Sequence, residues 1–318
     1  MKNKTRRRKV PVTASSNTKQ TLKANTSSSS SANPRTSARI IRQFHVLLKR
    51  KTQLEKRHAR RLENSTEEEA IQREIRNVED EIARMGGLEA YQRMSSIGQG
   101  KDRGGGSERV LVEWLTELGI GDEKGKGKEK LRMLEVGALK PDNYASCSTW
   151  VDVHPIDLRS SHPGIVEQDF LQTDMEENTE AWDAISLSLV VNFVPEPRDR
   201  GRMLDLAYNM LREDGFLFLV LPLPCVSNSR YLTSEHLAHL MEYIGFTKVK
   251  ERWKAEGGKM AYWLFKKKKF SSEGRPSSEP CLNSGFDAGI KSADDSTVRF
   301  DKKVVLREGK RNNFCILL

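Results

Sequence analysis

Residues 131–139 read LRMLEVGAL, the stretch that decides the predicted fold. An apolar, strand-like run leads into Glu135, and Gly137 then begins a turn. Further strand-like segments occupy 150–157, 164–169, 184–193, 216–221, 246–253 and 260–265, and helix-like segments occupy 198–211 and 234–243. Because buried strands alternate with helices, the chain is expected to form an α/β fold with a mostly parallel sheet.

Acidic residues stand where three of these strands should end. In an open α/β sheet, ligands bind beyond the carboxyl ends of the strands. Glu135 could face a cationic group there, and Gly137 would let the backbone approach a ligand. Asp157 could bind two ribose hydroxyls, while Asp169 could reach an adenine amino group, with the ring of Phe170 beside it. Together these signals favour an S-adenosylmethionine site, the alternative being a Rossmann fold that binds another nucleotide.

Two later loops carry groups suited to a nucleobase. The fourth strand leads into Asn192, Phe193 and Pro195. This order resembles the Asn-Pro-Pro-aromatic loop of amino-group methyltransferases, where an amide holds a base edge and an aromatic ring stacks on a base. After the fifth strand, a proline-stiffened loop offers amide, guanidinium and aromatic groups for a nucleotide, at Asn228, Arg230 and Tyr231. The alternative is a rigid loop that packs over the sheet.

Several long strings make the resemblance specific. They are GGLEAYQ (86–92), LEVGAL (134–139), SLSLVVNFVP (186–195), RGRML (200–204), LFLVLPLPCVSNSRY (217–231) and KRNNFCILL (310–318). With them the chain resembles the fungal 25S ribosomal RNA adenine-N1 methyltransferase family. The resemblance implies a Rossmann-like class I methyltransferase sheet, S-adenosylmethionine as cofactor, and large-subunit ribosomal RNA or the pre-ribosome as partner. It carries cofactor roles to Gly137 and Asp157; Asp152 also lies on the second strand, but Asp157 better fits the family's Ile-Asp-Leu.

The positive charge is concentrated near the N-terminus. The formal net charge is +10, yet residues 1–61 hold 18 Lys and Arg and one acid, so the remainder is acidic. Such a basic arm is expected to bind polyanions, and its run Arg6-Arg7-Arg8-Lys9 indicates a nuclear or nucleolar address. The expected parts are a disordered basic tail (1–35), a helical N-terminal extension with a helical hairpin (36–120), the methyltransferase domain (131–269), a disordered linker (270–299) and a C-terminal segment (300–318) ending in a strand.

Other classes of protein fit the sequence poorly. It has no run of 18 apolar residues, so no membrane span is expected. Four cysteines without a CxxC pair argue against disulfides and zinc, and His236 with His239 lacks a third metal ligand. Cys315-Ile-Leu-Leu formally fits a prenylation box, but burial as a strand explains it better.

The sequence leaves two functions from different classes open. The first is an enzyme that methylates N1 of an adenine in large-subunit ribosomal RNA. The second is a non-catalytic S-adenosylmethionine sensor that acts through protein partners, as in a metazoan relative of the family. The basic arm and the two loops favour the enzyme, since a sensor needs no surface for nucleic acid.

Overall fold

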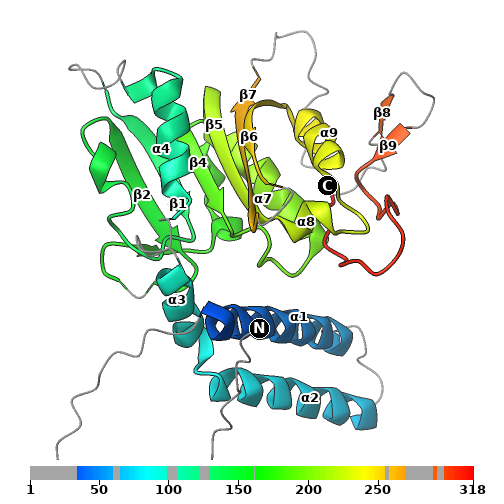
Figure 1. Ribbon diagram of the computed structural model, residues 1–318. Coiled ribbons are helices and arrows are strands. Elements are labelled where there is room, and N and C mark those ends of the chain that lie inside the picture. Colours follow the sequence, from blue (N-terminus) through cyan, green and yellow to red (C-terminus); the bar gives the residue numbers. More distant parts are fainter. Residues whose placement is uncertain are drawn as a thin grey trace, which may run out of the picture. The chain divides into compact units, whose positions relative to one another are not determined.

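A seven-stranded sheet lies at the centre of the described structure, with strand order β3-β2-β1-β4-β5-β7-β6 (Figure 1). Its strands are β1 (Leu131–Val136), β2 (Val151–Asp157), β3 (Val166–Glu167), β4 (Trp182–Ser188), β5 (Leu211–Pro222), β6 (Phe246–Arg252) and β7 (Met260–Lys267). Strands β1 to β5 are all parallel to one another, while β7 is antiparallel to both β5 and β6. This arrangement confirms the Rossmann-like class I methyltransferase sheet that the sequence predicted, with its switch point between β1 and β4.

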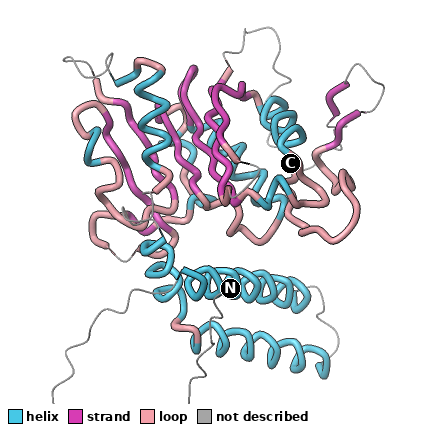
Figure 2. Tube along the Cα trace, in the orientation of Figure 1, coloured by secondary structure: helices cyan, strands magenta, loops and turns pink. Residues whose placement is uncertain are grey.

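The structure is a computed structural model that describes residues 34–59, 65–98, 106–121, 129–160, 162–254, 258–268, 289–291 and 297–318. The helices are α1 (Pro34–Ala59), α2 (Ser65–Arg84), α3 (Gly87–Gly98), α4 (Glu108–Glu117), α6 (Met175–Asn178), α7 (Pro197–Met210), α8 (Pro224–Ser227) and α9 (Ser234–Ile244), with 3-10 turns η2 (Ala145–Cys147) and η3 (Phe170–Gln172). Figure 2 shows how helices and strands alternate along the trace.

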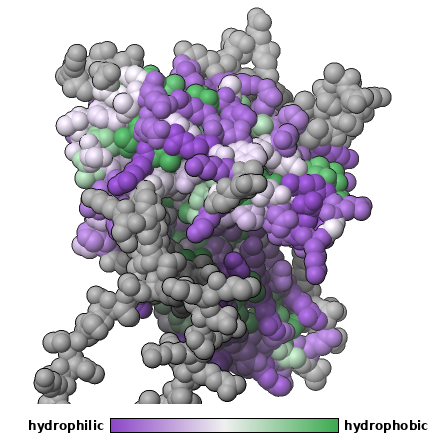
Figure 3. Space-filling view, viewed as in Figure 1, coloured by the Kyte–Doolittle hydropathy of each residue, from purple (hydrophilic) through white to green (hydrophobic). Residues whose placement is uncertain are grey.

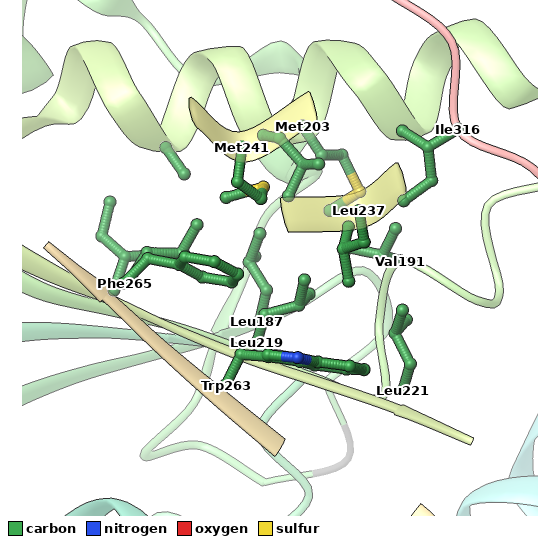
Figure 4. Packing of buried hydrophobic residues seen from close by; sticks show 14 of the residues in the cluster. Leu187, Val191, Met203, Leu219, Leu221, Leu237, Met241, Trp263, Phe265 and Ile316 are labelled. Carbon is green, nitrogen blue, oxygen red and sulfur yellow. The ribbon is translucent and has the colours of Figure 1, made fainter. Parts of the chain in front are cut away.

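Each face of the sheet has its own hydrophobic core. On one face, Trp263 and Phe265 of β7 pack with Met203 of α7 and Met241 of α9, and Ile316 joins them from the C-terminal segment (Figure 4). On the other face, α4 packs its buried residues onto β1, β4, β5 and β7 through a second core cluster. The two cores fix the sheet and so fix the positions of the loops at its edge. Helix α4 therefore belongs with the sheet, although the sequence analysis placed it in the helical extension.

The N-terminal helices form the expected hairpin. Leu47 and Leu54 of α1 are buried against Ile71 and Val78 of α2, at the spacing of an amphipathic seam. Ion pairs also cross the hairpin: Arg50 pairs with Glu74 and Lys51 with Glu79, so part of the positive charge of α1 is balanced within the hairpin. The predicted disordered tail, 1–35, lies outside the described residues except where α1 begins.

The C-terminal segment differs from its prediction. Phe314, Cys315 and Ile316 are buried as expected, but the segment adds no strand to the sheet and makes one isolated parallel bridge, between Ser229 and Asn312. It lies instead against α7, where a Cβ at Gly201 would meet the carbonyl oxygen of Leu317 at 1.9 Å.

Two smaller predictions also need correction. The fourth strand, expected to reach residue 193, ends at Ser188 because Leu189 has a left-handed φ of 58°, which turns the chain out of the sheet. Within the predicted disordered linker, 270–299, the described residues form two antiparallel strands, β8 (Gly289–Lys291) and β9 (Thr297–Arg299). The rest of that linker lies outside the described residues.

The surface of the described part is mixed. On the face seen in Figure 3, hydrophilic residues predominate and hydrophobic ones form small separate groups. In the residues that the structure describes, no helix is both long and apolar enough to cross a membrane. Those same residues contain no cluster of three or more His, Cys, Asp or Glu that could hold a metal ion.

Candidate active site at the carboxyl ends of the strands

Glu135 is a buried acid near the end of β1. In the sheet register it stands between Pro155 of β2 and Ser186 of β4. Asn143 donates a 2.7 Å hydrogen bond to its Oε1, while its Oε2 is buried without a partner among the described residues. Burial raises the pKa of Glu135 to about 7, and the bond from Asn143 only partly opposes this. The site therefore has an acceptor that a cationic ligand would satisfy.

Gly137 lies at the point where β1 meets the loop after β4. Its φ is 78°, and a Cβ there would lie 2.7 Å from Cγ2 of Val190. Both the backbone conformation and the space therefore require glycine. Next to Val190, the left-handed φ of Leu189 is a second unusual conformation, and strain of this kind concentrates at functional sites.

The end of β2 carries Asp157. Its Oδ1 accepts hydrogen bonds from the backbone N–H of Arg159 (3.0 Å) and from Nε2 of Gln92 in α3 (3.2 Å). Burial raises the pKa of Asp157, and these two bonds oppose the rise. Asp152, the alternative from the sequence, is exposed near the start of the strand. The geometry thus favours Asp157 as the acid at the ligand edge.

The third predicted acid and its aromatic neighbour have local roles. Asp169 caps η3, its Oδ1 accepting a 2.9 Å hydrogen bond from the backbone N–H of Leu171. Phe170 is 3 % exposed and belongs to the core beneath the sheet. Its ring is therefore not placed to pack on a ligand, which corrects that expectation; a bound base at this edge would meet Asp169 instead.

The loop after β4 is held rigidly. Asn192 is buried, and its Oδ1 has no partner among the described residues. The buried Arg200 of α7 donates to the carbonyl of Val194 (2.7 Å), to that of Pro195 (2.9 Å) and to that of Cys315 (2.6 Å). One guanidinium thus fixes the predicted Asn192–Pro195 loop to α7 and to the C-terminal segment.

The loop after β5 is committed to the C-terminal segment. Arg230 donates to Oδ1 of Asn313 (2.9 Å) and to the carbonyl of Gly309 (3.2 Å), with its guanidinium 5.9 Å from the ring of Tyr231. The carbonyl of Asn228 accepts a hydrogen bond from the backbone N–H of Asn312 (3.0 Å), and the carbonyl of Asn312 accepts one from the backbone N–H of Arg230 (2.9 Å). The packing alternative for this loop is therefore the better description of Asn228, Arg230 and Tyr231 in this structure.

Sequence reasoning missed the residues that the N-terminal helices bring to the site. The ring of His45 in α1 lies 3.8 Å from that of Phe193, and the ring of Tyr91 in α3 lies 5.1 Å from it. Gln92, which contacts Asp157, and Tyr91 both belong to the string GGLEAYQ, so that string was the available signal. His45 and Asn143 stand in no such pattern.

These groups fit the cofactor that the sequence predicts. S-adenosylmethionine carries an ammonium and a sulfonium, and two buried acceptor oxygens, Glu135 Oε2 and Asn192 Oδ1, have no partner in the part of the chain that the structure describes. Asp157 stands at the neighbouring strand end, where a ribose would lie, and Gly137 leaves room for the ligand to approach the backbone.

Comparison with known proteins identifies relatives over most of the chain. A 25S rRNA adenine-N(1) methyltransferase of Schizosaccharomyces pombe is 37% identical over 232 residues, 71% of this chain and 79% of that protein. A 25S rRNA (adenine(2142)-N(1))-methyltransferase of Saccharomyces cerevisiae is 36% identical over 188 residues, 58% of this chain and 53% of that protein.

Among solved structures, the Burkholderia thailandensis 1,6-didemethyltoxoflavin-N1-methyltransferase is 16% identical, with a TM-score of 0.40 over 51% of this chain and 76% of that one. The profile of the family described as 25S rRNA (adenine(2142)-N(1))-methyltransferase, Bmt2, matches residues 76–316, more than half of the chain and all of its sheet. The chain therefore belongs to the Bmt2 family of 25S rRNA (adenine(2142)-N(1))-methyltransferases.

Proposed function

We propose that the protein is an S-adenosylmethionine-dependent methyltransferase that methylates N1 of an adenine in large-subunit (25S) ribosomal RNA during ribosome biogenesis. The observation that carries the proposal lies at the switch point of the sheet. There Glu135 of β1 and Asn192 of the loop after β4 each bury an acceptor oxygen without a partner among the described residues, beside the turn at Gly137. Membership of the Bmt2 family supports the choice of substrate.

The reaction needs positioning more than acid–base chemistry. The cofactor supplies an electrophilic methyl group on its sulfonium. Adenine N1 has a free lone pair, so the N1–methyl bond forms as the sulfur–methyl bond breaks, and no proton is removed. The loop residues Asn192, Phe193 and Pro195 are assigned the positioning of the base, and the bonds from Arg200 keep that loop in place. N1 lies on the Watson–Crick edge, so the adenine must be unpaired or flipped out.

The acids hold the cofactor. Glu135 is assigned the amino-acid end, Asp157 the ribose and Asp169 the adenine, around Gly137. An ionised Glu135 would also favour the cationic product base by charge attraction.

The basic N-terminal stretch supports RNA binding and a nucleolar location. Residues 1–61 provide a surplus of cations for phosphates, an attraction without sequence choice. The choice of base would then be made at the strand-end loops. The proposed location follows the basic run Arg6-Arg7-Arg8-Lys9, typical of nuclear and nucleolar addresses.

Transfer of a labelled methyl group tests the proposal. Purified protein is incubated with methyl-labelled S-adenosylmethionine and a large-subunit rRNA transcript, and the RNA is digested to nucleosides. We expect label in 1-methyladenosine, and none with Gly137→Arg. Cofactor binding without label in any nucleoside would favour the sensor instead.

A further inference from the structure

Aromatic rings of the N-terminal helices pack at Phe193: the rings of His45 and Tyr91 contact it, and Phe44 stacks on Tyr91. Phe44 and Tyr91 stack with centroids 5.0 Å apart, and the imidazole of His45 lies 3.8 Å from the ring of Phe193 and 5.9 Å from that of Tyr91. Phe193 is the aromatic residue of the loop assigned to base positioning. Helices α1 and α3 therefore contribute side chains to this site.

Further contacts of the same helices cover the neighbouring strand ends. Nε2 of Gln92 in α3 donates to Asp157 at the end of β2 (3.2 Å) and to the carbonyl of Arg159 (2.6 Å). Lys56 of α1 pairs with Glu196 at 2.8 Å, just beyond the loop after β4. Burial, and then the nearby charge of Arg200, lowers the pKa of Lys49, another residue of α1. Helices α1 and α3 thus form one wall of the site.

Within this wall His45 has a chemistry that packing does not use. Its Nε2 is buried without a partner among the described residues. Burial, with a smaller effect of Lys49, lowers the pKa of His45 to about 4, so the ring is neutral at physiological pH. A neutral imidazole does not repel a sulfonium or a cationic methylated base, and it can still accept or donate a hydrogen bond.

A purely structural role would be better served by an apolar ring. A buried polar atom without a partner costs about 1–3 kcal/mol, which a phenylalanine at the same position would avoid. Polar atoms kept at such a cost concentrate at binding sites, where the ligand supplies the missing partner. The ligand expected beside Phe193 is the target base.

We propose that His45 is a base-binding residue of the methyl-transfer site: its ring and that of Phe193 form a wall against which the target adenine lies, and its Nε2 hydrogen-bonds to the edge of the base. The two rings are in contact, so the base lies alongside the pair and not between them. This inference rests on the proposed function and extends it, because it makes the N-terminal helices part of substrate recognition.

Ring-preserving variants test the assignment. His45→Phe keeps an aromatic ring against Phe193 but removes Nε2, whereas His45→Gln keeps a hydrogen-bonding group. His58→Phe is the matched control, because His58 lies on the same helix near Glu68 of α2. Methylation of a large-subunit rRNA transcript, S-adenosylmethionine affinity by calorimetry, and Tm are measured for all four proteins.

For His45→Phe we expect kcat/KM for RNA to fall about tenfold to 100-fold, while cofactor affinity stays within about twofold and Tm does not fall. His45→Gln should recover part of the loss, and His58→Phe should match the wild type. Methylation by His45→Phe at the wild-type rate would overturn the assignment. Faster methylation would also overturn it, since His45 would then obstruct the base.

A second readout separates this inference from the proposed function. Protein labelled with ¹⁵N-histidine is titrated with adenosine monophosphate in the presence of S-adenosylhomocysteine. A shift at Nε2 of His45, larger than with uridine monophosphate, is expected. If the wild-type protein methylated no adenine, the proposed function would fail, and this titration alone would decide the role of His45: an unchanged Nε2 signal rules it out.

Discussion

At the scale of single residues, the position of Glu135 in the sheet determines its ionisation. A carboxyl group beside a strand end in a buried sheet is expensive to ionise, which is why its pKa rises to about 7. In the unfolded chain the same group ionises near its ordinary value of 4.5. Between these two values folding stability therefore falls as the pH rises, because the folded state holds the proton longer. A bound cation would offset this cost.

Cofactor affinity should accordingly depend on pH. The ionised form of Glu135 attracts a cation, so S-adenosylmethionine should bind about threefold to tenfold more tightly at pH 7.5 than at pH 6. Calorimetry over this range measures the change. Glu135→Gln should bind more weakly with no such slope, and Glu113→Gln, which removes an exposed carboxylate, should keep the wild-type slope. An unchanged slope in Glu135→Gln would remove Glu135 from the cofactor site.

Gly137 gives a second prediction at this scale. Gly137→Ala places a Cβ in a left-handed residue and against Val190, so we expect a loss of about 1–3 kcal/mol in the free energy of unfolding and weaker cofactor binding. The control is Gly309→Ala, where φ is also positive, at 94°, but nothing lies within 4 Å of the added Cβ. Urea unfolding should show the smaller loss for Gly309→Ala; equal losses would mean that the contact with Val190 relaxes freely.

The positions of single residues were predictable from the sequence where backbone geometry set the outcome. Glu135, Gly137 and Asp157 follow from strand ends, and the structure brings them to one edge. The same rule predicted that the ring of Phe170 would lie beside the ligand, but the ring is buried in the core. His45 lies 148 residues before Phe193 in the chain, and only tertiary packing brings the two rings together. Neither its spacing nor its neighbours in the chain signal that contact.

At the scale of elements, the C-terminal segment helps to hold the loop after β4 in place. It meets α7 at Gly201, and it accepts a hydrogen bond from Arg200 through the carbonyl of Cys315. The sequence predicted burial of this segment correctly, because its apolar residues are consecutive. It predicted a strand wrongly, because whether an extended apolar run pairs with a sheet or packs on a helix depends on which surface is open.

Removing the Arg200 guanidinium should loosen this support. Arg200→Met leaves the carbonyls of Val194, Pro195 and Cys315 without their donor, so we expect a loss of about 2–4 kcal/mol in the free energy of unfolding. Methyl transfer should fall more than cofactor affinity. Arg198→Met, which removes exposed bonds to two carbonyls of the same segment, should cost less than about 1 kcal/mol. Similar costs for the two variants, measured in urea, would contradict this role.

In the hairpin of α1 and α2, acidic residues of α2 neutralise part of the positive charge of α1. Arg50 and Lys51, which the sequence offered to RNA, face the acids of α2. Glu74→Gln with Glu79→Gln should free them, tightening RNA binding and steepening its dependence on salt by up to about 1.8 in slope. Stability should change by less than about 1 kcal/mol, since exposed ion pairs contribute little.

A second double variant controls for net charge. Glu69→Gln with Asp80→Asn removes the same charge from exposed positions of α2. We expect it to raise RNA affinity less, as measured by filter binding over a range of salt concentrations. Equal effects of the two double variants would mean that only total charge matters, and that the pairing across the hairpin has no influence on RNA.

At the scale of the whole molecule, the α/β class and the mostly parallel sheet were predictable because apolar runs, turns and helix ends recur in a regular order along residues 131–265. The packing of α4 on the sheet was not predictable, because the sequence of a short amphipathic helix does not indicate which surface the helix packs against. The same holds for the candidate site. Its residues at the sheet edge were predictable from the sequence, whereas the wall that α1 and α3 add was not.

The most direct test of the central claim is reverse-transcription mapping of 25S rRNA from cells that lack this protein. N1-methyladenine blocks base pairing and stops the polymerase. We predict that one stop in the large-subunit rRNA is lost, that the wild-type protein restores it, and that Asn192→Ala and Gly137→Arg do not. A stop pattern unchanged by the deletion, or restored by Gly137→Arg, would contradict the claim that this site methylates the rRNA.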